Sequence, residues 1–361
     1  MNIRIKDICR FGKKSDIKAG EGNTKGKYMF FTSSIDKDKR IDKFDYDEEG
    51  IIMGTGGNAT LHYYSGKFAV STDCLVLLPN SSYKCKYLYY FFLHNMRVLE
   101  GGFRGAGLKH TSKSYIENIE LTKTHSLLEQ DKIISVLSNI DNTIVLQNKR
   151  LKLINELTRS LFIEMFGDPV ENPFMFEKQR LSKIGELERG VSKHRPRNAP
   201  ELLGGKYPLI QTGEISNSDL YINKFENTYS ELGLSQSKLW KKGTLCITIA
   251  ANIAKTGILT FDSCFPDSVV GFVPNKLTNN IFIHYWFSFF QKILEEEAPE
   301  SAQKNINLKV LSNLDVIVPP IELQNKFAAV VAQIDKSKLA VKKSLEELEI
   351  LKKSLMQKYF A

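Results

Sequence analysis

Several signatures of common protein classes are scarce or missing in this 361-residue sequence. Its five cysteines are odd in number and show no CxxC or CxxH spacing, so the sequence predicts neither a disulfide framework nor a zinc site. The six histidines show no HxH or HxxxH spacing that would suit another metal ion. No apolar run reaches the roughly 18 residues of a membrane span, and the first residues lack the apolar core of a signal peptide. We therefore expect a cytoplasmic protein without a bound metal.

Motifs of catalysis are missing as well. The glycine-rich segment 54–58 lacks the last glycine of a dinucleotide-binding loop, and the Gly-Lys pairs at 26–27 and 205–206 are followed by tyrosine, which excludes a P-loop. The Asn-Pro-Phe segment at 172–174 lacks the second proline of an amino-methyltransferase motif. The Pro-Asp pair at 266–267 is not followed by the Glu-x-Lys of a metal-dependent nuclease. We expect no enzymatic activity and no cofactor.

The composition is that of an ordinary globular protein with an excess of positive charge. Hydrophobic residues make up 42% of the chain and charged residues 25%, which argues against extended disorder. The net charge of +9 favours a polyanion as partner, although basic charge alone does not identify one. A chain of this length is expected to form two or three domains.

One string of landmarks occurs twice, about half a chain apart. In the first copy the landmarks are Gly26-Lys27-Tyr28, Gly50-Ile51-Ile52, Pro79-Asn80, Lys109-His110 and Glu129-Gln130. In the second copy they are Gly205-Lys206-Tyr207, Gly243-Thr244-Leu245, Pro274-Asn275, Lys304-Asn305 and Leu323-Gln324. Each copy ends in a long helical pattern, so the order is head, helix, head, helix. Such a duplication favours a pseudo-twofold arrangement, which suits a ligand with two half-sites.

The two helical patterns carry apolar residues at spacings of three, four and seven, which is typical of a helix with one apolar seam. The first seam consists of Ile133, Leu137, Ile140, Ile144, Leu151, Ile154 and Leu161. The second consists of Phe327, Val331, Ile334, Val341, Leu345, Leu348 and Leu355. Lys338 and Lys352 fall on the second seam and weaken it as a self-sufficient coiled coil. Each helix of roughly 40 residues would be about 60 Å long, and we expect the two to pair antiparallel through their seams.

The segments before the helices have the pattern of mixed α/β heads. Short β-rich runs alternate with glycine and asparagine turns, and one aromatic helix interrupts each set. The predicted fold class is therefore α/β, with two tandem mixed α/β heads separated by two long antiparallel helices in a pseudo-twofold arrangement. The expected divisions are a first head at 1–125, a central helix at 126–166, a linker at 167–177, a second head at 178–320 and a C-terminal helix at 321–361.

Polar and basic residues at glycine-rich turns recur at similar places in both heads. Phosphates are bound by lysine, arginine and hydroxyl groups, and base edges by arginine, asparagine, glutamine and threonine. In the first head the candidates for DNA binding are Lys13, Lys14, Ser33, Ser34, Lys37, Arg40, Thr55, Asn58, Arg104, Lys109 and His110. In the second head they are Lys193, Arg195, Arg197, Gln211, Thr212, Asn252, Lys255, Gln303, Lys304 and Asn305. Any one of these residues alone is more often a solvated turn, but the repeated set favours duplex DNA as the ligand.

On these residues the chain resembles the DNA-specificity subunit of type I restriction-modification enzymes. The resemblance covers essentially the whole chain, and the stretches that carry it are 165–170, 205–215, 250–257, 303–306 and 318–324. The first head departs from the pattern, with Phe-Thr-Ser-Ser at 31–34 and Thr-His at 124–125 in place of the Gln-Thr-Gly and Pro-Pro of the second. Target-recognition heads vary because each reads a different sequence.

The resemblance implies a non-catalytic subunit in which each head is a target-recognition domain that reads one half of a bipartite DNA site. It further implies that the helix pair sets the unread spacer and docks two methyltransferase subunits, and that a restriction and translocation subunit joins the full complex. Two alternatives stay open at this point. One is a coiled-coil adaptor with two ligand- or protein-binding heads, and the other is a specificity chain of a methylation system without a nuclease.

Overall fold

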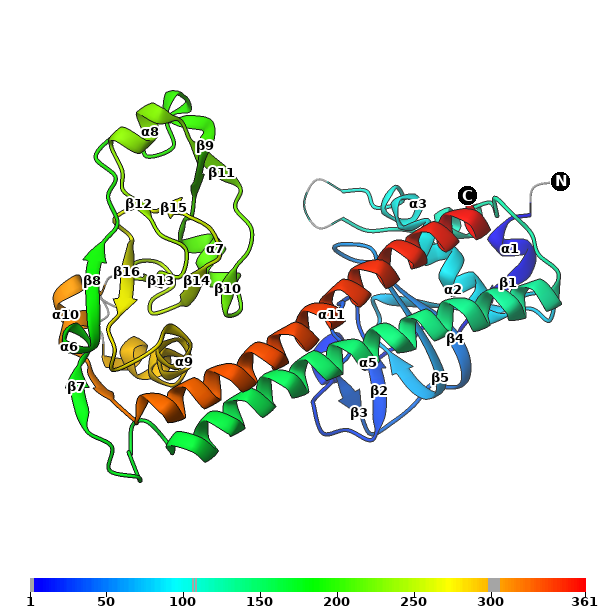
Figure 1. The fold of residues 1–361 in the computed structure, drawn as a ribbon. Helices are drawn as coiled ribbons and strands as arrows, with labels where there is room; N and C mark the ends of the chain where they lie inside the picture. Colours follow the sequence, from blue (N-terminus) through cyan, green and yellow to red (C-terminus); the bar gives the residue numbers. More distant parts are fainter. Residues whose placement is uncertain (1–2, 106, 108, 298–305) are drawn as a thin grey trace. The chain divides into compact units, whose positions relative to one another are not determined.

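The structure, a computed structural model, describes residues 3–105, 107, 109–297 and 306–361, without the side chains of 290–297. The chain divides into two compact units, of which unit 1 comprises Met1–Lys149 and Val341–Ala361 and unit 2 comprises Arg150–Ala340. Each unit therefore contains one head together with a part of both long helices (Figure 1).

Unit 1 is built on one curved sheet with helices on a single face. Its strands are β1 (Cys9–Phe11), β2 (Tyr28–Phe31), β3 (Arg40–Ile41), β4 (Tyr46–Gly54), β5 (Thr60–Val70) and β6 (Cys74–Pro79). They are arranged in the order β1-β6-β4-β5-β2-β3, and only the β2–β5 pair is parallel within this sheet. The helical elements are α1 (Ile5–Ile8), η1 (Ala19–Glu21), α2 (Cys85–His94), α3 (Met96–Glu100) and α4 (Lys113–Glu117).

The two faces of this sheet bury different cores. On one face, α2 places the buried rings of Tyr87 and Phe91 against the sheet, so the aromatic helix serves as core. On the other face, Tyr46 stacks on Phe68 with ring centroids 4.9 Å apart, inside a second apolar cluster. The turn between β4 and β5 carries the polar side chains of Thr55 and Asn58.

Unit 2 contains three smaller sheets. Its strands are β7 (Lys178–Arg180), β8 (Gly185–Arg189), β9 (Leu203–Leu209), β10 (Tyr221–Ile222), β11 (Asn227–Tyr229), β12 (Leu239–Trp240), β13 (Leu245–Thr248), β14 (Thr256–Leu259), β15 (Ser263–Cys264), β16 (Val269–Pro274) and β17 (Asp315–Ile317). The sheet orders are β10-β14-β13-β16-β8, β11-β9-β15-β12 and β17-β7. The helical elements of the head are α6 (Leu181–Ile184), η2 (Pro200–Leu202), α7 (Thr212–Ser216), α8 (Glu231–Ser235), α9 (Asn280–Glu297) and α10 (Leu308–Ser312).

The long helices are α5 (Leu127–Phe166) and α11 (Ile321–Phe360), each of 40 residues. Ser126 and Glu129 form a capping box at the start of α5, with 2.8 Å between the Ser126 amide and the Glu129 carboxylate. α5 ends at Gly167, whose φ of +73° gives the left-handed backbone that glycine adopts without strain. The two prolines that follow at 169 and 173 prevent the helix from continuing.

Within each unit the two helices run antiparallel, as the sequence predicts. In unit 1, Asp141 near the start of α5 pairs with Lys352 near the end of α11, at 2.7 Å. In unit 2 the ends are exchanged, since Phe166 at the end of α5 contacts Phe327 near the start of α11, with ring centroids 5.4 Å apart. The α/β class with two long antiparallel helices is confirmed.

The predicted seam residues are all buried or half-buried, and the first turns of each helix also join the core of a head. The buried ones are Ile133, Leu137, Ile140 and Val341 in unit 1, and Phe327 and Val331 in unit 2. The half-buried ones are Ile144, Leu345, Leu348 and Leu355 in unit 1, and Leu151, Ile154, Leu161 and Ile334 in unit 2.

The two lysines on the seam are both paired with aspartates of their own unit. Lys352 contacts Asp141, which also accepts a hydrogen bond of 2.8 Å from the Tyr90 hydroxyl on α2. Lys338 contacts Asp219 at 3.0 Å, and the Lys338 side chain is only 14% exposed. These pairs replace apolar packing with directional contacts, which fix the register of the helix against its surroundings.

A buried glutamine at the same repeat position anchors each head to its helix. In unit 1, the side chain of Gln130 donates to the carbonyl groups of Ser82 (3.2 Å) and His125 (2.9 Å) and accepts from the Lys84 amide at 2.8 Å. Gln130 therefore holds the turn that precedes α2.

In unit 2, Gln324 makes the equivalent contacts. It donates to the carbonyl groups of Leu277 (3.0 Å) and Pro319 (2.8 Å) and accepts from the Thr278 hydroxyl at 2.9 Å and the Asn279 amide at 3.3 Å. The repeat in the sequence is thus accompanied by a repeat of the hydrogen bonds that join each head to its helix.

We expect Gln324→Leu to lower the free energy of unfolding by roughly 2–4 kcal/mol, because it leaves several buried polar groups without a partner, at about 1–3 kcal/mol each. Gln333→Leu is the matched control, since Gln333 lies exposed on the same helix. Urea titration of both variants against the parent protein measures the effect. Equal stability of the two variants would show that the Gln324 contacts are not needed.

Candidate nucleic-acid interface

Four segments of unit 1 meet beyond the end of β4, and we call this meeting point junction 1. The Thr55 amide donates to the Asp73 carbonyl at 2.8 Å, and the Thr111 amide donates to the Thr55 carbonyl at 3.0 Å. The hydroxyl groups of Ser33 (2.5 Å) and Thr55 (3.0 Å) donate to the same Asp73 carbonyl. Junction 1 therefore ties the β4–β5 turn to the segments before β3, before β6 and before α4.

Several predicted DNA-binding residues surround junction 1. The amide of Gly57 donates to the Lys109 carbonyl at 2.9 Å, which places Lys109 beside the β4–β5 turn that carries Asn58. Arg104 and His110 exchange two backbone hydrogen bonds of 2.9 Å and so form a small hairpin, with both side chains exposed. Ser34 is held by its carbonyl group, which contacts His62 Nε2 at 2.8 Å.

Unit 2 has a corresponding meeting point, junction 2, beyond the end of β13. The Ile249 amide donates to the Ser268 carbonyl at 3.0 Å, and the Ile306 amide donates to the Ile249 carbonyl at 2.9 Å. These bonds tie the β13–β14 turn to the segments before β16 and before α10, which correspond to the segments before β6 and before α4 in junction 1. The β13–β14 turn closes through the Thr248 hydroxyl, which accepts from the Lys255 amide at 3.0 Å.

Asn252 lies exposed on the β13–β14 turn, whose neighbour Ala251 has a φ of +64°. Gln211 and Thr212 stand at the start of α7, where the Gln211 amide donates to the Glu214 carboxylate at 3.1 Å. The remaining residues predicted beside this turn, Gln303, Lys304 and Asn305, lie outside the described residues.

Other predicted residues lie on separate segments. Lys13 and Lys14 are exposed after β1, where the Lys13 carbonyl accepts from the Tyr46 hydroxyl at 2.6 Å. Lys37 is exposed in the β2–β3 connection, and Arg40 is exposed on β3. These residues are exposed cations of unit 1 on segments other than the β4–β5 turn.

In unit 2, the loop of Lys193, Arg195 and Arg197 is fixed by residues that the sequence did not single out. The Gln236 side chain accepts from the Lys193 amide at 2.8 Å, and Asp267 forms ion pairs with Arg195 (3.1 Å) and Arg197 (2.5 Å). Arg195, Arg197 and Gln211 line one cavity of about 400 Å³. The structure thus brings three predicted residues together.

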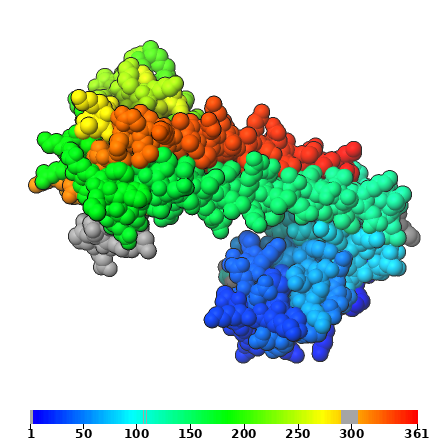
Figure 2. Space-filling model, turned by 60° about the horizontal axis from the view of Figure 1, so that its bottom comes forward, coloured from blue at the N-terminus to red at the C-terminus, as the bar shows by residue number. Residues whose placement is uncertain are grey.

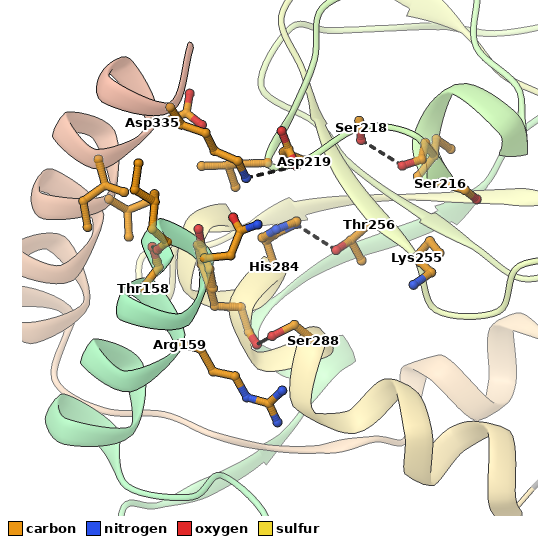
Figure 3. Close-up of a pocket in the computed structure, with 18 of the residues that line it drawn as sticks. Thr158, Arg159, Ser216, Ser218, Asp219, Lys255, Thr256, His284, Ser288 and Asp335 are labelled. Atoms are coloured by element: carbon orange, nitrogen blue, oxygen red, sulfur yellow. Dashed lines mark hydrogen bonds and ion pairs between the residues drawn. The ribbon is translucent and has the colours of Figure 1, made fainter. Parts of the chain in front are cut away.

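A larger cavity of about 460 Å³ lies in unit 2 between the helices α5, α9 and α11 and the β13–β14 turn (Figure 3). Lys255, Arg159 and Ser288 line it, and His284 in its wall contacts the Thr256 hydroxyl at 2.9 Å. Burial, and then the charge of Lys338, lower the pKa of His284 to about 4, whereas Asp219 opposes this shift. His284 is therefore neutral at pH 7.

No group of three or more histidine, cysteine, aspartate or glutamate side chains could hold a metal ion within the part of the chain that the structure describes. All five cysteines are buried, and burial raises the pKa of the Cys9 thiol to about 12. Among the described helices, none is both long and apolar enough to cross a membrane.

The depressed pKa of His284 predicts a pH dependence of stability in unit 2. The unfolded chain binds a proton near the ordinary value of 6.5 and the folded chain only near 4, so protons favour unfolding between these values. Relative to the parent protein, we expect His284→Asn to lose less stability as the pH falls from 6.5 to 4. His194→Asn, at an exposed histidine, should behave like the parent. Thermal unfolding across this pH range measures the effect, and parallel curves for the parent protein and His284→Asn would contradict the assignment.

Comparison with known proteins places these features in one family. The model of the type I restriction modification DNA specificity domain matches residues 1–156 and 175–350. The chain is 23% identical over 395 residues to the type I restriction enzyme MjaVIII specificity subunit of Methanocaldococcus jannaschii, covering 98% of this chain and 90% of that protein. It is 22% identical over 352 residues to the EcoBI specificity subunit of Escherichia coli, covering 86% and 73%.

The fold is also that of a solved member of this group. The crystal structure of a type I restriction-modification system S subunit from M. genitalium superposes with a TM-score of 0.73 at 17% identity, covering 100% of this chain and 96% of that one. On the extent of the family match, the chain belongs to the type I restriction modification DNA specificity family.

Proposed function

We propose that this chain is the sequence-reading, non-catalytic subunit of a type I restriction-modification complex, in which each head reads one half of a bipartite DNA site. The observation that carries the proposal is the repeated junction. Both heads join three corresponding segments through equivalent hydrogen bonds. The turn is joined to one segment by Thr111 to Thr55 at 3.0 Å and Ile306 to Ile249 at 2.9 Å, and to the other by Thr55 to Asp73 at 2.8 Å and Ile249 to Ser268 at 3.0 Å. The side chains on these turns differ between the heads, so one scaffold would present two different reading surfaces.

Charge supports DNA as the ligand. The net charge of +9 suits a polyanion, and exposed cations such as Lys109 and Arg104 surround junction 1. These side chains would contact phosphates, which position a protein on DNA, whereas amide and hydroxyl groups on the turns would contact base edges. The family match does not favour the alternative of a coiled-coil adaptor.

The helices would set the unread spacer and dock two methyltransferase subunits. Support comes from exposed apolar side chains on α5. In each unit, part of the α5 surface is uncovered on the face drawn in Figure 2. In unit 1, Val145 and Leu146 are each 65% exposed, and in unit 2 Leu157 is 59% exposed. Exposed apolar residues in such number on one helix are typical of a protein interface. A restriction and translocation subunit would join the full complex.

The test is co-expression with the methyltransferase subunit encoded beside this chain, in a host free of adenine methylation, followed by mapping of methyl-adenine along the genome. We expect a two-part motif with a fixed gap that depends on this chain. Exchange of residues 178–320 for those of a relative should change one half of the motif and leave the other half intact. If methylation were independent of this chain, or if the exchange altered both halves, the proposal would be wrong.

Reversal of charge at Lys109 tests the phosphate contacts. We expect Lys109→Glu to weaken binding of the complex to all duplex sequences alike and to reduce the slope of log affinity against log salt concentration by about 1. Fluorescence anisotropy with cognate and unrelated duplexes between low and moderate salt measures both quantities. Loss of discrimination at a single base pair would instead assign Lys109 to base reading.

A further inference from the structure

One carboxylate in unit 2 holds two guanidinium groups at the wall of a cavity. Asp267 Oδ2 lies 3.1 Å from Arg195 Nη2, and Asp267 Oδ1 lies 2.5 Å from Arg197 Nη2. Asp267 is itself fixed, because its backbone carbonyl accepts a hydrogen bond from the Arg189 guanidinium. The two arginines therefore have defined orientations before any ligand binds.

The two arginines differ in what else they contact. Arg195 Nη1 donates to the carbonyl groups of Ser192 (2.6 Å) and His194 (2.8 Å), so this side chain holds its own loop in place. Within the part of the chain that the structure describes, the Arg197 side chain has an ion pair with Asp267 and no other polar partner. The Nε hydrogen, the Nη1 hydrogens and the second Nη2 hydrogen of Arg197 are thus available to a ligand, and the second Nη2 hydrogen can form a two-pronged donor pair with Nε or Nη1.

The backbone and the surroundings of Arg197 suit a reading role. The Tyr229 hydroxyl donates to the Arg197 carbonyl at 3.3 Å, which holds the backbone against the head. The adjoining cavity of about 400 Å³ is also lined by Asn198 and Gln211, whose amide groups can contact base edges. Polar groups that can recognise a base therefore converge from two segments.

Charge decides between a phosphate and a base as the partner of Arg197. Asp267 cancels one of the positive charges of Arg189, Arg195 and Arg197, which weakens the attraction of a phosphate. A guanine edge is neutral and presents two acceptors, N7 and O6, which match the fork of a fixed arginine. The geometry favours guanine.

We propose that Arg197 is a specificity-determining residue of unit 2 that reads a guanine in the half-site of this head, and that Asp267 is the positioning residue that fixes its orientation. The inference rests on the proposed function and assigns one reader within it. Arg195 supports the loop and does not itself contact the base.

The experiment maps methyl-adenine motifs produced by the complex of the full chain with its methyltransferase partner. We expect Arg197→Ala and Arg197→Lys to lose preference for guanine at one position of one half-site, by about 5- to 150-fold, while the other half-site stays unchanged. Lysine keeps the charge but loses the two-pronged donor geometry, so a phosphate contact would survive Arg197→Lys and a guanine contact would not.

Asp267→Asn tests the positioning role. We expect discrimination at the same base pair to fall, while affinity of the complex for unrelated duplexes does not fall, because a negative charge has been removed. The matched control is Asp262→Asn, whose carboxylate pairs with Lys241 at 2.9 Å on the exposed surface of the same head. This control should leave the motif as it is in the parent protein.

Each outcome separates this inference from the proposed function. A parent complex without a bipartite motif would overturn both the proposed function and the assignment of Arg197. A bipartite motif that Arg197→Lys leaves unchanged, or in which Arg197→Lys relaxes positions of both halves, would overturn only the assignment of Arg197. If Arg197→Ala abolished methylation altogether, the motif obtained with Arg197→Lys would test the assignment. Loss of the guanine preference would support it, and a retained preference would overturn it.

Discussion

Burial of the helix ends is the interaction on which both units depend. In unit 1, Phe360 at the end of α11 is fully buried and contacts Tyr87 with ring centroids 5.3 Å apart. In unit 2, Phe166 at the end of α5 is equally buried and contacts Phe282 at 5.0 Å. Large aromatic side chains dominate core energetics, and the core of each head contains helix residues from both copies of the repeat. The heads and helices cannot be regarded as independent modules that happen to be linked.

Polar contacts then fix the register of the long helices, which apolar packing alone would leave less defined. A half-buried pair such as Lys352 and Asp141 gains little net stability, because both charges lose water when they come together. An apolar pair would pack as well, but it would also tolerate a shifted helix. The ion pairs and the two buried glutamines need specific partners, so they favour one alignment of each helix within its own unit.

Much of the fold could be predicted from the sequence, since it rests on patterns that repeat. The duplication and the apolar seams indicated two heads and two antiparallel helices, and the landmark Gln130 and Gln324 proved to be the anchors of each head. The site is less accessible to prediction. Asp267 and Gln236 act on the arginine loop from distant segments, and the Asp73 carbonyl is a backbone group, so none of the three follows a local pattern. Which side chains touch bases stays a prediction, and the contribution of residues 303–305 lies outside the described residues.

The contact between the start and the end of the chain in unit 1 has a consequence for biosynthesis. The Thr122 hydroxyl donates to the Phe360 carbonyl at 2.6 Å, across 238 residues of sequence. During translation the first head leaves the ribosome long before the segment that fills its core, whereas unit 2 has all of its residues by position 340. The head made second therefore has all of its residues first, whereas the head made first lacks Phe360 in its core until the last part of α11 has been made. A stop codon at position 341 would remove Val341–Ala361 from unit 1 and leave the residues of unit 2 complete.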